Sequence, residues 1–183
     1  MASIKIKQHD IKDCGAACLV SIGNHYKVNL PIARVRQFAN TDKRGTNVLG
    51  VIEGAEKMGF TAKGVKGGLD AIDKIPLPAI AHVVIKQQLQ HYIVIYKVSS
   101  PSGRSGGAIE VMDPGYGKME TYTFEDFQKI WSGVLILFAP NDDLTPTNEK
   151  VSPSRRFWNL IQPHKTILIQ SLVGAIVFTV LGL

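Results

Sequence analysis

A cysteine, a histidine and an aspartate whose side chains could work together follow one another along this chain. Cys14 opens a run of small residues, His91 begins an apolar segment, and Asp113 ends another apolar segment just before a Pro-Gly turn. Thiol catalysis needs a nucleophilic sulfur, an imidazole base and a group that orients the imidazole. The three residue types therefore indicate nucleophilic catalysis by a thiol, provided that the fold brings them together.

Gln8 and the helix that Cys14 begins would complete such a site. The free N–H groups and the dipole at a helix N-terminus favour a thiolate. The side-chain NH₂ of Gln8, six residues upstream, and the backbone N–H of Cys14 could hold a developing oxyanion. The alternatives are a small buried hydrophobic residue for Cys14, an exposed loop amide for Gln8 and ordinary turn chemistry for Asp113.

Four further histidines compete with His91 for the role of base: His9, His25, His82 and His164. His25 falls at the far end of the predicted first helix, about 16 Å from Cys14 at a rise of about 1.5 Å per residue. His82 lies inside an apolar strand and is predicted to be a core histidine, whereas His164 belongs to the C-terminal tail. His9 is close to Cys14 in sequence and remains an alternative. His91 is favoured because it stands at a strand entrance, where its ring can face a cleft.

The second cysteine, Cys18, lies one helical turn beyond Cys14 and is predicted to be a core residue. A disulfide between two positions of one helical turn is geometrically awkward. A metal site would need two more ligands at suitable spacing, and the sequence offers no convincing pair. We therefore expect no cofactor and no metal, and a reducing cytosolic setting that keeps the thiol active.

The hydrophobic pattern predicts helices first and strands afterwards. With 45% hydrophobic and 20% charged residues the chain is typical of a globular protein. Asp13, Thr46 and Thr123 are predicted to cap helices. The predicted helices cover residues 14–25, 31–38, 46–59, 69–75 and 123–131, and the predicted strands cover 60–65, 78–85, 91–98, 108–112, 118–122 and 134–138. This order predicts an α+β domain over residues 1–140, in which the helical part packs on an antiparallel sheet and leaves a cleft between the layers.

The C-terminal part is predicted to meet a membrane. Residues 141–154 are predicted to form a Pro-, Asp- and Thr-rich linker, and residues 155–183 an interfacial segment and the start of a transmembrane helix, either of a longer protein or of a truncated gene product. Arg155, Arg156 and Lys165 are the only charged residues after position 150, so this tail carries half of the net charge of +6. By the positive-inside rule these cations place the preceding domain in the cytoplasm. A buried C-terminal helix is the alternative to a membrane span. The sequence has no stripe of basic residues that would indicate a nucleic-acid partner.

Four sequence motifs together resemble the N-terminal cysteine peptidase domain of peptidase-containing ABC exporters, the double-glycine leader (bacteriocin-processing) peptidases. The motifs are QHDIKDCGAACL at 8–19, GTNVLG at 45–50, HYIVI at 91–95 and DPG at 113–115. The resemblance implies a papain-like fold. It also implies that Cys14 is the nucleophile, His91 the base, Asp113 its orienting acid and Gln8 the oxyanion donor.

The same resemblance implies a substrate and partners. Members of the family cut a leader peptide after a Gly-Gly or Gly-Ala pair, and the attached transporter exports the remaining peptide. An amphipathic leader helix would dock in a surface groove, whose residues the sequence does not identify. No G-x-x-x-x-G-K-[ST] loop occurs in the 183 residues. We therefore expect ATP hydrolysis and transport to belong to an ABC transporter core in further sequence or in a separate chain.

The sequence thus predicts a thiol endopeptidase for the leaders of secreted peptides, tethered to the inner or plasma membrane with its peptidase domain in the cytoplasm. One alternative is a non-catalytic domain that docks leader peptides for an exporter. A second alternative is a thiol transferase or deamidase on the same scaffold.

Overall fold

The chain forms two compact units, Met1–Glu149 and Lys150–Leu183, and each is described by itself. The structure is a computed structural model, and it describes residues 3–86, 88–99, 107–142, 144–149, 157–158 and 160–182. The first unit holds all the residues that the sequence singles out for catalysis.

Three helices form the N-terminal part of the first unit: α1 (Cys14–His25), α2 (Ile32–Phe38) and α3 (Val48–Lys57). Asp13 stands at the predicted N-cap position of α1 but does not cap it through its side chain, and the cap of α3 lies one residue beyond the predicted Thr46. Asp13 makes no capping hydrogen bond to α1, because it closes a capping box with Asp10 around the short 3-10 helix η1 (Ile11–Asp13). The cap of α3 is Asn47, whose side chain accepts a hydrogen bond from the backbone N–H of Gly50. Both corrections come from a preceding polar turn that uses the predicted cap in another way.

The remainder of the first unit is a six-stranded sheet in which every neighbouring pair is antiparallel. The strands, in spatial order, are β2 (Phe60–Lys66), β7 (Trp131–Pro140), β3 (Ala79–Ile85), β4 (Leu89–Ser99), β5 (Ala108–Asp113) and β6 (Lys118–Thr123). The predicted strands are all present, and β4 and β7 begin earlier than predicted. His91 is therefore the third residue of β4 and not its first.

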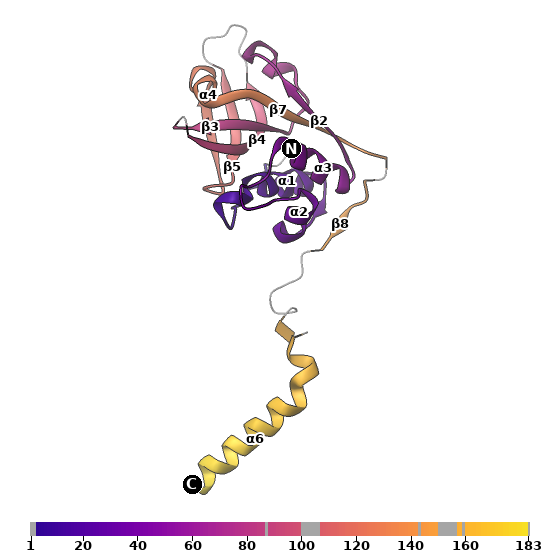
Figure 1. Ribbon diagram of the computed structural model, residues 1–183, viewed down its shortest axis with the longest axis vertical. Coiled ribbons are helices and arrows are strands. Elements are labelled where there is room, and N and C mark those ends of the chain that lie inside the picture. The colour runs from indigo at the N-terminus through magenta and orange to yellow at the C-terminus, as the bar shows by residue number, and fades with distance from the viewer. Residues whose placement is uncertain are drawn as a thin grey trace. The chain divides into compact units, whose positions relative to one another are not determined.

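The sheet separates two hydrophobic cores. Helices α1, α2 and α3 pack on one face around Leu19 and Ile80, and Figure 1 shows these helices grouped on one side of the strands. The 3-10 helix η2 (Leu69–Lys74) and helix α4 (Phe124–Ile130) cover the other face around Phe127. Ile80 and Ala81 are neighbours in β3 and enter different cores, as the alternation of side chains along a strand requires.

A short parallel pair joins the two ends of the first unit. Strand β1 (Val28–Asn29) pairs with β8 (Thr147–Asn148), which lies in the segment that the sequence assigns to a linker. The backbone N–H of Glu149 donates to the carbonyl of Asn29 over 2.9 Å, and the Glu149 carboxylate lies 3.1 Å from Nε of Arg34. Residues 144–149 therefore pack on the helical part of the domain.

The second unit contains the 3-10 helix η3 (Gln162–His164) and the apolar helix α6 (Lys165–Leu181). The stretch Gln162–Leu181 has 20 residues with a mean hydropathy of 1.6, and none of its side chains is buried. By length and composition it is the one helix in the described ranges that could cross a membrane. Arg155 and Arg156 lie outside the described residues.

Candidate active site

The start of α1 holds Cys14 at a tightly packed turn. The side chain is buried, with 6% of its surface exposed, and it lies in the first turn of a 12-residue helix. The next residue, Gly15, packs against Thr46, because a Cβ added to Gly15 would lie 2.9 Å from Cβ of Thr46. Only a residue without a side chain allows this approach, so the packing of Gly15 fixes where the sulfur of Cys14 can lie.

His91 and Asp113 form a buried pair on adjacent strands. Nε2 of His91 lies 2.8 Å from Oδ1 of Asp113, and the two residues are 5% and 4% exposed. The backbone N–H of Gly115 donates to the same carboxylate oxygen over 2.7 Å. The turn that the sequence predicts after Asp113 therefore holds the carboxylate in place, and the carboxylate in turn holds the imidazole ring.

Cys14 is the second hydrogen-bond partner of His91. Burial favours the neutral imidazole, but hydrogen bonds to Asp113 and to Cys14, together with the negative charges of these two groups, raise the pKa of His91 to about 9. Because Nε2 is taken by Asp113, the nitrogen left for the thiol is Nδ1. The three residues are thus brought together in the order sulfur, imidazole, carboxylate, which suits a thiolate–imidazolium pair.

Gln8 lies against the turn that follows Asp113. Its backbone N–H donates to the carbonyl of Pro114 over 2.9 Å. Its side-chain oxygen is buried and has no hydrogen-bond partner among the described residues. Since the oxygen and nitrogen of a side-chain amide can exchange places by a flip, this end of Gln8 can also offer an N–H. An unpartnered buried amide is a group that a bound ligand can satisfy.

Cys18 is enclosed in the core, as the sequence predicts. Its sulfur donates a hydrogen bond to the backbone carbonyl of Tyr92 over 3.3 Å, and its surface is fully covered. Burial raises the pKa of the Cys18 thiol, and the nearby charges of Cys14 and Asp113 raise it further. Of the two cysteines, only Cys14 lines a cavity among the described residues.

A cleft of about 780 Å³ opens beside Cys14. It is bounded by η1, by the loop 40–47 and by the neighbouring strands β3 and β4. His82 and Tyr92, which face each other across these strands, both line the cleft. The sequence predicted a core position for His82, but the structure half-buries it and places it on the cleft. Only the strand register, which the sequence pattern does not provide, places His82 opposite Tyr92.

The other histidines lie elsewhere. His9 is exposed, and His164 lies in η3 of the second unit. His25 packs at the far end of α1, with its ring centroid 5.1 Å from that of Tyr26 and 5.8 Å from that of Tyr96. Among the described histidines, His91 is the one that carries both a carboxylate and the thiol of Cys14 as hydrogen-bond partners.

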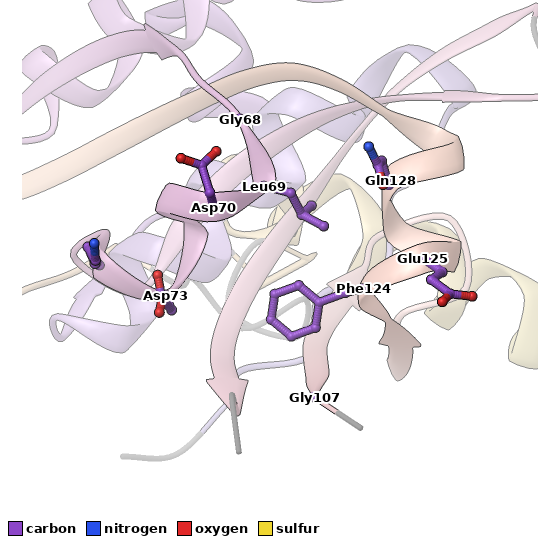
Figure 2. Close-up of a pocket in the computed structure, with 9 residues that line it drawn as sticks. Gly68, Leu69, Asp70, Asp73, Gly107, Phe124, Glu125 and Gln128 are labelled. Atoms are coloured by element: carbon purple, nitrogen blue, oxygen red, sulfur yellow. The ribbon is translucent and has the colours of Figure 1, made fainter. Parts of the chain in front are cut away.

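A second hollow of similar size lies between η2 and the start of α4. Figure 2 shows its lining side chains, with Leu69 and the ring of Phe124 on different elements and the carboxylates of Asp70, Asp73 and Glu125 around them. It shares no described lining residue with the cleft at Cys14. Since its described lining contains neither cysteine nor histidine, it offers no nucleophile for thiol chemistry.

Comparison with known protein families places this domain in a recognised class. The model of the peptidase C39 family matches residues 3–143. The processing and transport ATP-binding protein LagD of Lactococcus lactis, named for lactococcin G, is 37% identical over 166 residues, which are 90% of this chain and 23% of LagD. The mesentericin Y105 transport and processing protein MesD of Leuconostoc mesenteroides is 34% identical over 97% of this chain and 24% of MesD. The chain thus spans about a quarter of the length of these relatives.

Solved structures agree with the assignment. The peptidase domain of Streptococcus ComA, described as a bifunctional ABC transporter of a quorum-sensing pathway, superposes with a TM-score of 0.67 at 34% identity, over 76% of this chain and all of that domain. A double-glycine motif protease from an AMS/PCAT transporter, solved with its leader peptide, gives a TM-score of 0.66 at 26% identity, over 76% of this chain and 93% of its own. The predicted papain-like α+β fold is confirmed, and the chain belongs to the peptidase C39 family of cysteine peptidases.

Proposed function

We propose that this protein is a thiol endopeptidase that removes double-glycine leaders from secreted, bacteriocin-like peptides in association with ABC-type export. The observation that carries the proposal is the buried pair of His91 and Asp113, 2.8 Å apart, together with the Cys14 thiol, which acts with Asp113 to raise the pKa of His91. The family match supports the peptidase activity. The double-glycine protease solved with a leader peptide supports the class of substrate.

In the proposed reaction, Cys14 attacks the carbonyl of the second of the two small residues, the last residue of the leader. His91 holds the proton taken from the thiol at Nδ1, while Asp113 accepts a hydrogen bond at Nε2 and stabilises the imidazolium. His91 then gives its proton to the leaving amine as the C–N bond breaks and an acyl-enzyme remains on sulfur. Water, deprotonated by the neutral imidazole, attacks the thioester and releases the leader.

Gln8 is proposed as a donor to the oxyanion that forms during both attacks. Its backbone is fastened to the turn after Asp113, and its side-chain amide has a buried end without a partner in the described part of the chain. The free N–H groups at the start of α1 would contribute a second donor beside Cys14. Loss of one such donor typically lowers turnover by about 10²–10³-fold.

The domain organisation and the cellular place of the protein are part of the same proposal. Residues 1–140 would form the peptidase domain, 141–154 a linker and 155–183 an interfacial segment with the start of a membrane span. The apolar stretch Gln162–Leu181 supports a membrane contact. The cations that precede it support a cytoplasmic position for the peptidase domain. An ABC transporter core, as named in the relatives, would be the export partner.

A cleavage assay tests this function. The 183-residue chain in detergent is incubated with a synthetic precursor that carries a double-glycine leader, and the products are weighed by mass spectrometry. We expect one cut directly after the pair of small residues. Cys14→Ala should bind the precursor but leave it intact, whereas the matched control Cys18→Ala should still cut. Cleavage by Cys14→Ala, or binding without cleavage by the wild-type chain, would contradict the proposal.

A further inference from the structure

His82 stands in the cleft without a part in the proposed proton transfers. It lies on β3, directly opposite Tyr92 of β4, and its ring centroid is 5.2 Å from that of Tyr92. His82 lines the same cleft as Cys14. Its side chain is only half buried, so a substrate that enters the cleft can reach it.

Ser132 fixes the protonation of one ring nitrogen of His82. Its hydroxyl donates to the backbone carbonyl of His82 over 2.9 Å, and the same oxygen lies 2.8 Å from Nδ1 of the ring. A hydroxyl has one proton. The two contacts are satisfied together when that proton goes to the carbonyl and Nδ1 carries a hydrogen that the serine oxygen accepts, and we infer this tautomer.

The other ring nitrogen is therefore a hydrogen-bond acceptor. Burial lowers the pKa of His82, and the nearby charge of His91 lowers it further, so the ring is neutral under cytosolic conditions. A neutral imidazole with a hydrogen on Nδ1 presents a lone pair at Nε2. No described residue donates a hydrogen bond to that lone pair. The ring thus brings an unused acceptor, held in one tautomer, to the cleft in which Cys14 attacks.

We propose that Nε2 of His82 binds the substrate by accepting a hydrogen bond from a backbone N–H next to the scissile bond. The inference rests on the proposed function, because it concerns the same cleft and the same peptide. A pair of glycines has no side-chain group for an enzyme to grip, so its backbone N–H and C=O groups are what recognition can use. An acceptor fixed on the sheet would align such a segment with the sulfur of Cys14.

Kinetics with three variants separate substrate binding from a structural role. His82→Phe keeps a planar ring and removes the acceptor, so KM should rise by about tenfold, the equivalent of one neutral hydrogen bond, while kcat stays within about twofold. His82→Gln offers an amide oxygen and should recover most of the loss. Ser132→Ala releases the tautomer but keeps the imidazole, which can still present Nε2 as an acceptor, so its KM should rise by a smaller factor, up to about threefold.

A second arm replaces the donor on the substrate. Four precursor peptides each carry one N-methylated amide, at the two residues on either side of the bond. We expect one of them to show a KM raised about tenfold with the wild-type chain and no further rise with His82→Phe. The rate at which iodoacetamide labels Cys14 should be the same in His82→Phe and wild type, which shows that the variant keeps its catalytic site.

Three results would overturn the role of His82. The first is an unchanged KM in His82→Phe, and the second is an equal rise of KM in His82→Phe and Ser132→Ala. The third is that, for all four methylated peptides, the effects of methylation and of His82→Phe on KM multiply. A wild-type chain that cuts no precursor would instead overturn the proposed function, and the role of His82 with it. Cleavage by wild type with no coupling to His82 leaves the function intact and rejects this inference alone.

Discussion

The charge on His91 depends on a contest between its surroundings. Burial disfavours the imidazolium, but Asp113 and Cys14 outweigh burial and raise the pKa of His91 to about 9. The ring therefore keeps its second proton throughout the physiological range. In the proposed reaction the leaving amine takes this proton, so the loss of the proton from His91 sets the alkaline limit of cleavage.

The first prediction concerns the pH dependence of cleavage. As pH rises through about 9, His91 loses its proton and kcat/KM should fall. Asp113→Asn removes the negative charge and weakens the hydrogen bond that raise this pKa. The fall should therefore move to lower pH, and the maximal rate should drop by about 10²-fold or more. The measurement is kcat/KM from pH 5 to 10 for both proteins. An alkaline limb that stays in place in Asp113→Asn would contradict the assigned pairing.

The second prediction concerns stability. The pKa of His91 is higher in the folded protein than the ordinary value of 6.5. The proton on this ring thus contributes at most about 3 kcal/mol to the free energy of unfolding. The contribution is fully present below about pH 6.5 and is lost as pH rises through about 9. Urea unfolding at pH 6 and at pH 9.5 measures the free energy of unfolding at each pH. Between the two, this free energy should decrease less in His91→Gln than in wild type. Equal decreases in both proteins would show that another group is responsible.

The grouping of Cys14, His91 and Asp113 could be predicted from their types, their order and the motifs around them, and their catalytic roles stay a prediction. The structure brings these three side chains into contact. The place of His82 could not be predicted. The apolar pattern of this strand does not indicate which of its residues faces a cleft. The register of β3 on β4 is needed to place His82 there.

At the scale of elements, the position of α1 depends on a close approach to the loop before α3. Gly15→Ala would favour a helix by its intrinsic propensity. Here, however, the new methyl group would lie 2.9 Å from Cβ of Thr46 and 3.3 Å from Cγ2 of Val51. The third prediction is a loss of about 1–3 kcal/mol in unfolding free energy, with a lower kcat because the neighbouring sulfur is displaced.

Gly67→Ala is the matched control, because a Cβ at Gly67 meets no atom within 4 Å. It should leave both the unfolding free energy and kcat within error of wild type. If Gly15→Ala behaves like this control in urea unfolding and in cleavage, then the packing of α1 on Thr46 does not position the cysteine.

Helix α3 and most strands could be predicted from periodicity, whereas α1, buried on all sides from Cys14 to Asn24, shows no such pattern. The pair β1 and β8 could not, because two-residue strands carry no period and their partners lie at opposite ends of the domain. The missing capping hydrogen bond of Asp13 and the shift of the α3 cap to Asn47 could not be predicted, because several polar residues precede each helix and only the backbone geometry decides which of them accepts the hydrogen bond.

At the scale of the whole molecule, the apolar stretch Gln162–Leu181 is the feature that the first unit does not need for its own core. We propose that it enters a membrane. The fourth prediction is that the chain floats with liposomes and that Val173→Lys weakens this binding strongly, because a lysine at the centre of a span costs about 2.5–3.5 kcal/mol. The control Gln128→Lys adds the same charge on an exposed residue of α4 and should float like wild type. Equal flotation of both variants would exclude insertion of this stretch.

The most direct test of the central claim, that His91 activates the sulfur of Cys14, is the rate of iodoacetamide labelling at neutral pH, read by intact mass and by peptide mapping. We predict one rapid adduct, on Cys14, and none on the enclosed Cys18 over the same time. His91→Gln should slow the adduct by about tenfold or more, because the imidazolium no longer stabilises the thiolate. Labelling at Cys18, or an unchanged rate at Cys14 in His91→Gln, would contradict the account.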